Sequence, residues 1–162
     1  MAYSVFISHS DEDSHMANVI ASQFRSYGVT PIIASQFRPA TPSQTLSEKI
    51  QNLILQSHCL LAIVTRNGLN STFVQQEIGF ALGRKKPVIP FVETGIHQEE
   101  LALLQGMEHI PIDWNNLEGS FSQLNNWVYS LKKSKEETDR LLLFGGITLL
   151  ALIIIFGTRP EE

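Results

Sequence analysis

The chain has 162 residues, which is enough for one domain with a substantial core. Its 12 Lys and Arg are outnumbered by 16 Asp and Glu, and the net charge of -4 gives no electrostatic reason to expect nucleic-acid binding. The single cysteine, Cys59, excludes an intrachain disulfide, and its apolar surroundings predict a buried thiol rather than a nucleophile or a metal ligand.

Five short apolar runs rich in β-branched residues predict five strands. They cover residues 3–8, 31–34, 58–65, 87–92 and 109–112. Stretches with helical periodicity separate these runs, and such alternation is typical of a parallel sheet with helices on both faces. We therefore expect one α/β domain with a five-stranded, doubly wound parallel sheet over residues 1–133.

Five helices are expected in the remaining stretches of this domain. They cover residues 16–27, 43–56, 71–83, 98–105 and 118–133. Gly28 is placed to end the first helix, and Asp11 or Asp13 is expected to cap its start. Ser43 or Thr45 is the expected N-cap of the second helix.

In a doubly wound sheet, ligands bind beyond the carboxyl ends of the strands. The loops that follow the first three predicted strands are residues 8–13, 35–42 and 66–72. We therefore expect a ligand site where these three loops meet.

One acidic side chain in the third predicted helix lies where an apolar one is expected. Winding this helix at about 100° per residue puts Glu77 between Phe73 and Ala81 within the apolar face. A carboxylate there must be paired, hydrogen-bonded or open to a cleft, because burying it alone is costly. The alternative is that Glu77 borders the face and reaches water or a lysine.

The composition changes near the end of the chain. Residues 141–157, LLLFGGITLLALIIIFG, contain no charged side chain, and only Thr148 can form side-chain hydrogen bonds. A soluble helix would carry a polar stripe, so a single transmembrane helix is favoured over a buried core helix. The excess of Lys and Arg before this segment predicts a cytosolic domain and an external tail at residues 158–162. Residues 134–140 are either a linker or a continuation of the preceding helix.

Three segments form a combined pattern: VFISHSDED, LSEKIQNLILQSHCLLAIVTRNGLNSTFVQQEIGFAL and KKPVIPFV. Together they resemble a Toll/interleukin-1 receptor (TIR) domain, over nearly the whole length from residue 3 to about 133. Each segment is weak evidence alone, but the set is specific. The resemblance implies a flavodoxin-like fold, and it assigns Glu77 to the catalytic glutamate of the family's W-x-x-x-E-like helix. Phe73 stands where the family has tryptophan.

In enzymatic TIR domains this glutamate serves the cleavage of NAD between nicotinamide and ribose. Nicotinamide leaves NAD as a neutral molecule, so a carboxylate that stabilises an oxocarbenium-like transition state can suffice without a general acid. The resemblance therefore implies NAD as a substrate, no bound cofactor, and self-association of TIR domains. Phe73 would form a wall for the ribose or nicotinamide, or it would pack in the core.

Further candidate residues lie in the loops after the first two strands. Ser8, His9 and Ser10 could contact the nucleotide, or they could cap the first helix. Nothing nearby in sequence orients His9 as a general base. Phe37 and Arg38 belong to the loop that covers the active site and mediates self-association in TIR domains, and Arg38 could bind a phosphate. The histidines lack the spacing of metal ligands, so no metal site is predicted.

Two functions from different classes fit these features. The first is a membrane-anchored NAD glycohydrolase, activated by self-association and similar to prokaryotic defence TIR proteins. The second is a non-enzymatic scaffold that recruits other TIR domains through the loop around Phe37. The spacing around Glu77 favours the enzyme, whereas Phe73 in place of tryptophan leaves room for the scaffold. A phosphoacceptor receiver is excluded, because Ile63, Val64 and Thr65 stand where it needs an aspartate.

Overall fold

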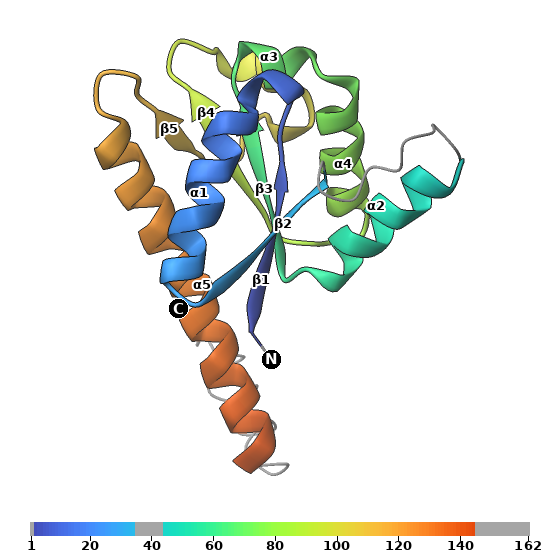
Figure 1. Cartoon of the computed structure of the whole chain (residues 1–162), viewed down its shortest axis with the longest axis vertical. Coiled ribbons are helices and arrows are strands. Elements are labelled where there is room, and N and C mark those ends of the chain that lie inside the picture. Colours follow the sequence, from blue (N-terminus) through green and yellow to red (C-terminus); the bar gives the residue numbers. More distant parts are fainter. Residues whose placement is uncertain (1, 35–43, 145–162) are drawn as a thin grey trace, which may run out of the picture. The chain divides into compact units, whose positions relative to one another are not determined.

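The computed structural model describes residues 2–34 and 44–144. Within them, five parallel strands form one sheet in the order β2-β1-β3-β4-β5 (Figure 1). The strands are β1 (Tyr3–Ser8), β2 (Val29–Ile33), β3 (Cys59–Val64), β4 (Val88–Glu93) and β5 (Ile110–Ile112). This order is that of a flavodoxin-like sheet, so the predicted α/β fold with a five-stranded parallel sheet is confirmed.

Prolines in the sheet lie where a missing N–H group is tolerated. Pro31 and Pro111 lie on β2 and β5, the two edge strands of the described sheet. Pro90 lies on β4, but the pairing of β4 with β5 starts only at Phe91. Each proline therefore has a free side of the ladder available to it.

Helices and 3-10 turns connect the strands, and Figure 1 shows α1 on one face of the sheet and α2 with α4 on the other. The α-helices are α1 (Ser14–Ser26), α2 (Gln44–Gln56), α3 (Arg66–Asn70), α4 (Thr72–Gly83) and α5 (Leu117–Phe144). The 3-10 helices are η1 (Asp11–Asp13) and η3 (Gln98–Leu104). The short helix α3 lies in a stretch where the sequence predicted only a loop.

The ends of the helices agree only in part with the predictions. Gly28 ends α1 with a φ of 69°, a conformation that favours glycine. Asp13 is the N-cap residue of α1, as predicted, but its side chain makes no capping hydrogen bond. Helix α2 begins at Gln44, so Thr45 lies inside it and is not its N-cap, whereas Ser43 lies outside the described residues. Ser71 caps α4 by accepting a hydrogen bond from the backbone N–H of Val74.

The core is built around β3, whose six residues are all buried. Cys59, on this strand, has no exposed surface, as the sequence predicted. Burial outweighs the opposing effects of Tyr3 and Lys86 and raises the pKa of Cys59 to about 11. The thiol therefore stays protonated at neutral pH and is a poor nucleophile.

The chain divides into two compact units, Met1–Asn126 and Trp127–Glu162. Helix α5 begins in the first unit and continues through residues 134–140 of the second, where Lys135 forms an ion pair with Asp139. The predicted domain boundary at residue 133 stays a prediction.

The predicted transmembrane segment, residues 141–157, lies mostly outside the described residues, as does the tail at 158–162. Only its first four residues are described, and they form the end of α5. Among the residues whose structure is described, no helix is long and apolar enough to cross a membrane.

Candidate functional site

The strand order creates a topological switch point between β1 and β3. The chain leaves these neighbouring strands toward opposite faces of the sheet, and the loops that follow them diverge at their carboxyl ends. Two of the three predicted site loops, those that follow β1 and β3, therefore begin next to each other here. The third, residues 35–42, carries Phe37 and Arg38 and lies outside the described residues.

Glu77 lies at this switch point. It projects from the middle of α4, is half-buried, and accepts a hydrogen bond from the Ser8 hydroxyl. Ser8 is the last residue of β1 and is fully buried. The sequence-based requirement that this carboxylate be hydrogen-bonded is thus met, by a partner 69 positions away in the chain.

A second carboxylate, Asp13, joins the loops that follow β1 and β3. Its Oδ2 atom accepts hydrogen bonds from the hydroxyls of Ser10, at 2.7 Å, and Thr65, at 2.6 Å. Asp13 is 7% exposed, so these two hydroxyls replace the water that a carboxylate requires. Sequence reasoning missed this role. The available signal was an acidic residue soon after the first strand together with a threonine at the end of the third.

Gly68 lets α3 approach the end of β3 closely. A Cβ atom built on Gly68 would lie 2.4 Å from the carbonyl oxygen of Ile63. The backbone N–H of Gly68 also donates a hydrogen bond to the Thr65 hydroxyl, which caps α3. A side chain at position 68 would therefore displace the turn that forms one wall of the site.

His9 follows Ser8 and is 8% exposed. Its Nδ1 atom lies 2.6 Å from the carbonyl oxygen of Ser10. A carbonyl oxygen only accepts hydrogen bonds, so Nδ1 is the donor and carries a proton. Ser10 is itself fixed by its bond to Asp13.

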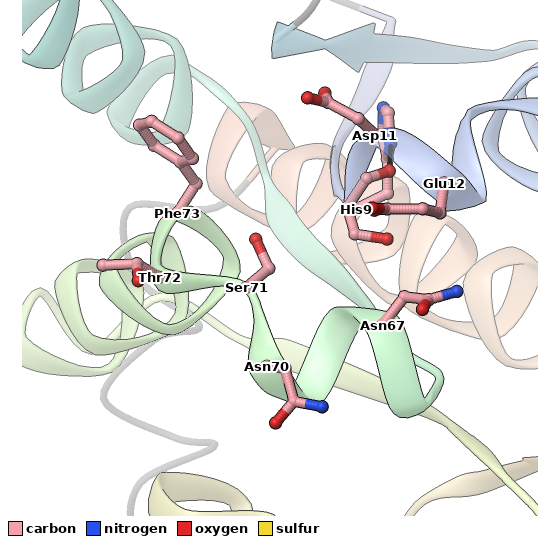
Figure 2. A pocket seen from close by; sticks show the side chains of 9 residues that line it. His9, Asp11, Glu12, Asn67, Asn70, Ser71, Thr72 and Phe73 are labelled. Carbon is pink, nitrogen blue, oxygen red and sulfur yellow. Dashed lines mark hydrogen bonds between the residues drawn. The ribbon is translucent and has the colours of Figure 1, made fainter.

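A pocket of about 350 Å³ opens between η1 and the segment from α3 to the start of α4 (Figure 2). Its lining residues come from both sides: His9, Ser10, Asp11, Glu12, Asn67, Asn70, Ser71, Thr72 and Phe73. Hydroxyl, amide and carboxylate groups dominate, and no lysine or arginine is among these lining residues. Phe73 is 60% exposed and is the only aromatic ring among them apart from the imidazole of His9.

Glu77 does not line this pocket, but it lies close to it along α4. Phe73, which does line it, precedes Glu77 by four residues, which is about one helical turn of 5.4 Å. The structure thus brings together the candidates Ser8, His9, Ser10, Phe73 and Glu77.

A network of exposed hydrogen bonds and one ion pair also holds the start of α3. The Arg66 backbone N–H donates to Glu93, and its guanidinium pairs with Glu100 at 2.6 Å and donates to the carbonyl of Gly95. A backbone hydrogen bond from His97, and then Arg66, lower the pKa of Glu100. These contacts tie the start of α3 to β4 and η3. In the part of the chain that the structure describes, no group of three or more potential metal ligands occurs.

Comparisons with known proteins agree with this architecture. The family model described as TIR domain matches residues 5–143. A similar solved structure is that of the TIR domains in the activated Roq1 resistosome directly recognizing the pathogen effector XopQ, with a TM-score of 0.63 and 12% sequence identity. The match covers 78% of this chain and 99% of that chain, and at this identity it shows the fold alone. No curated protein matches the chain.

Proposed function

The chain belongs to the TIR domain family, and from this premise we propose that it is an NAD glycohydrolase in which Glu77 is the catalytic carboxylate. One observation carries the proposal: Glu77 is half-buried at the switch point of the sheet and bonded to Ser8. A carboxylate in this position is held in one orientation and partly shielded from water. Both properties strengthen its interaction with a developing positive charge.

The proposed reaction breaks the bond between C1′ of the ribose and the nicotinamide nitrogen. The bonding electron pair goes to the nitrogen, so the positively charged ring leaves as neutral nicotinamide. Positive charge then builds on the ribose, where Glu77 stabilises it and holds the ribose hydroxyls. Ser8 keeps one carboxylate oxygen in place.

The pocket beside Glu77 supports a nucleoside as the group that is bound. Its volume of about 350 Å³ falls at the lower end of the range of ligand pockets, about 300–1,000 Å³. Its hydroxyl and amide groups suit ribose, and Phe73 can form a wall for an aromatic ring. Since no cation lines it, we expect the diphosphate of NAD to lie elsewhere, with Arg38 as its candidate partner.

We further propose that the domain is tethered to a membrane by residues 141–157, with residues 1–133 in the cytosol, and that self-association through the loop around Phe37 activates it in a defence or signalling response. A high local concentration on a membrane favours such assembly.

A non-enzymatic TIR scaffold is the competing proposal. The exposure of Phe73, at 60%, supports it, because an aromatic ring at the surface can also contact a partner protein. The two proposals differ in one measurable product, nicotinamide.

To separate them, the full chain in detergent or lipid is incubated with NAD at increasing protein concentration, and nicotinamide release is measured. We expect Glu77→Gln to lower release at least about 100-fold, because the side chain keeps its size and loses its charge. The matched control is Glu99→Gln, an exposed glutamate on η3, which should match the wild type. Equal release by wild type and Glu77→Gln, or none at any concentration, would favour the scaffold. Thermal melting checks that each variant is folded.

A further inference from the structure

The hydrogen bond of His9 defines the tautomer of its neutral ring. With the proton on Nδ1 donated to the Ser10 carbonyl, the Nε2 atom of the neutral imidazole carries a lone pair and is basic. Adjacent sequence offered no side chain to orient His9, but the structure supplies a backbone carbonyl. This is the arrangement that a histidine base requires: one nitrogen held by a fixed acceptor and the other left to take up a proton.

The acceptor that orients His9 is itself fixed. Ser10 donates its hydroxyl to Asp13, and Asp13 also binds Thr65 at the end of β3. The histidine is therefore connected to the sheet through a sequence of short contacts between buried groups. Figure 2 shows His9 on the η1 side of the pocket with Asp11 and Glu12, opposite Asn67, Asn70 and the start of α4.

The titratable groups around His9 are acidic. The titratable groups that share the pocket with His9 are Asp11 and Glu12 on η1, and the lining residues from α3 and α4 contain none. The adjacent Asp13 is also acidic, and Glu77 lies beyond Ser8. The lining residues of the pocket therefore place no lysine or arginine beside His9.

His9 also lies close to the proposed reacting centre. It directly follows Ser8, whose hydroxyl contacts Glu77, and it shares the pocket with Phe73, one helical turn from Glu77. A ribose held at Glu77 would therefore have the His9 pocket next to it.

We propose that His9 is a second catalytic residue, the general base that activates water in NAD hydrolysis; this rests on the proposed function. After the C1′–N bond breaks, a water oxygen forms a bond to C1′. The water gives one proton to Nε2 of His9, and the products are ADP-ribose and nicotinamide. His9 then releases the proton to solvent, which restores the neutral ring.

Two reactions can consume the oxocarbenium-like intermediate, and only one of them needs a base. Water must lose a proton when it attacks, and so needs a base. A pyridine such as 3-acetylpyridine attacks through its ring nitrogen and loses no proton. Removal of the base should therefore reduce hydrolysis and leave exchange of nicotinamide for 3-acetylpyridine largely intact.

The test incubates the full chain in lipid or detergent with NAD and 3-acetylpyridine, and measures the ratio of ADP-ribose to the exchanged dinucleotide. His9→Asn is the main variant, because its amide nitrogen can still donate to the Ser10 carbonyl but has no basic lone pair. We expect this ratio to fall at least about tenfold. His15→Asn, an exposed histidine on α1, should keep the wild-type ratio. Added imidazole should restore hydrolysis in His9→Asn.

A purely structural role of His9 would lower both products together, so an unchanged ratio in His9→Asn overturns this proposal alone. If His9→Asn is unfolded by thermal melting, His9→Gln is measured in its place with the same expectation. Release of nicotinamide by the wild type without any ADP-ribose also overturns it. No nicotinamide release by the wild type overturns the proposed function as well.

Discussion

At the scale of single residues, Asp13 links two loops that are distant in sequence. Its carboxylate accepts hydroxyl hydrogen bonds from Ser10, three positions away, and from Thr65, 52 positions away. All three residues are buried, so water does not compete for these bonds. Both loops of the candidate site therefore depend on one acceptor.

Removing that acceptor should destabilise the fold. We expect Asp13→Ala to lower the free energy of unfolding by about 2 kcal/mol, because it leaves two buried hydroxyls without an acceptor for their protons. Urea unfolding of the full chain in detergent, followed by circular dichroism, measures the change. Glu12→Ala, at an exposed neighbouring position, should stay within about 0.5 kcal/mol of the wild type. Equal effects of the two substitutions would contradict the assigned role of Asp13.

The sequence was informative about Glu77 and uninformative about Asp13, for a physical reason. Glu77 interrupts the apolar face of its own helix, so a local pattern shows that it needs a partner. Asp13 lies in a polar stretch, where an acidic residue breaks no pattern. Its function arises from contacts that exist only after β1 and β3 pair.

At the scale of elements, α3 shows the same limit. Its five residues, Arg66–Asn70, carry no apolar periodicity, so the sequence predicted a loop. Three features hold this turn in place: the Thr65 cap, the close approach of Gly68 to Ile63, and the long-range contacts of Arg66 with Glu93 and Glu100. Most short helices depend on such packing rather than on intrinsic propensity.

The close approach at Gly68 gives a prediction for this element. Gly68→Ala should lower the free energy of unfolding by about 2 kcal/mol, because the new methyl group would meet the Ile63 carbonyl oxygen and force the backbone apart. Gly83→Ala is the matched control, since a Cβ there has no neighbour within 4 Å. The control should be neutral or stabilising by up to about 1 kcal/mol. Urea denaturation of both variants compares them, and a neutral Gly68→Ala would show that the turn can shift without cost.

The strands were the most predictable elements. The first was predicted with its observed bounds, Tyr3–Ser8, and the others within about two residues at each end. The first two residues of β2, Val29 and Thr30, were missed because the predicted run begins at Pro31. Pairing with β1 extends the strand across them, which no local pattern reveals.

At the scale of the whole molecule, the proposed membrane anchor can be tested directly. We expect the full chain to sediment with membranes and to remain there after an alkaline wash. Leu150→Arg combined with Ile154→Arg should move it to the soluble fraction, because a charge within a spanning helix costs up to about 3 kcal/mol, most at its centre. Leu150→Ile combined with Ile154→Leu keeps the segment apolar and should not change the distribution. A wild-type chain released by the alkaline wash would contradict the anchor.

The prolines of the two outer strands limit how copies of this molecule can associate. An exposed strand normally offers a row of N–H donors onto which a further strand can add, and this is how many sheets extend from one molecule into the next. Here Pro31 on β2 and Pro111 on the three-residue β5 reduce that row at both borders of the described sheet. Growth of an assembly by continuous β-pairing is therefore disfavoured, and contacts between helices and loops are the remaining route to a reversible oligomer.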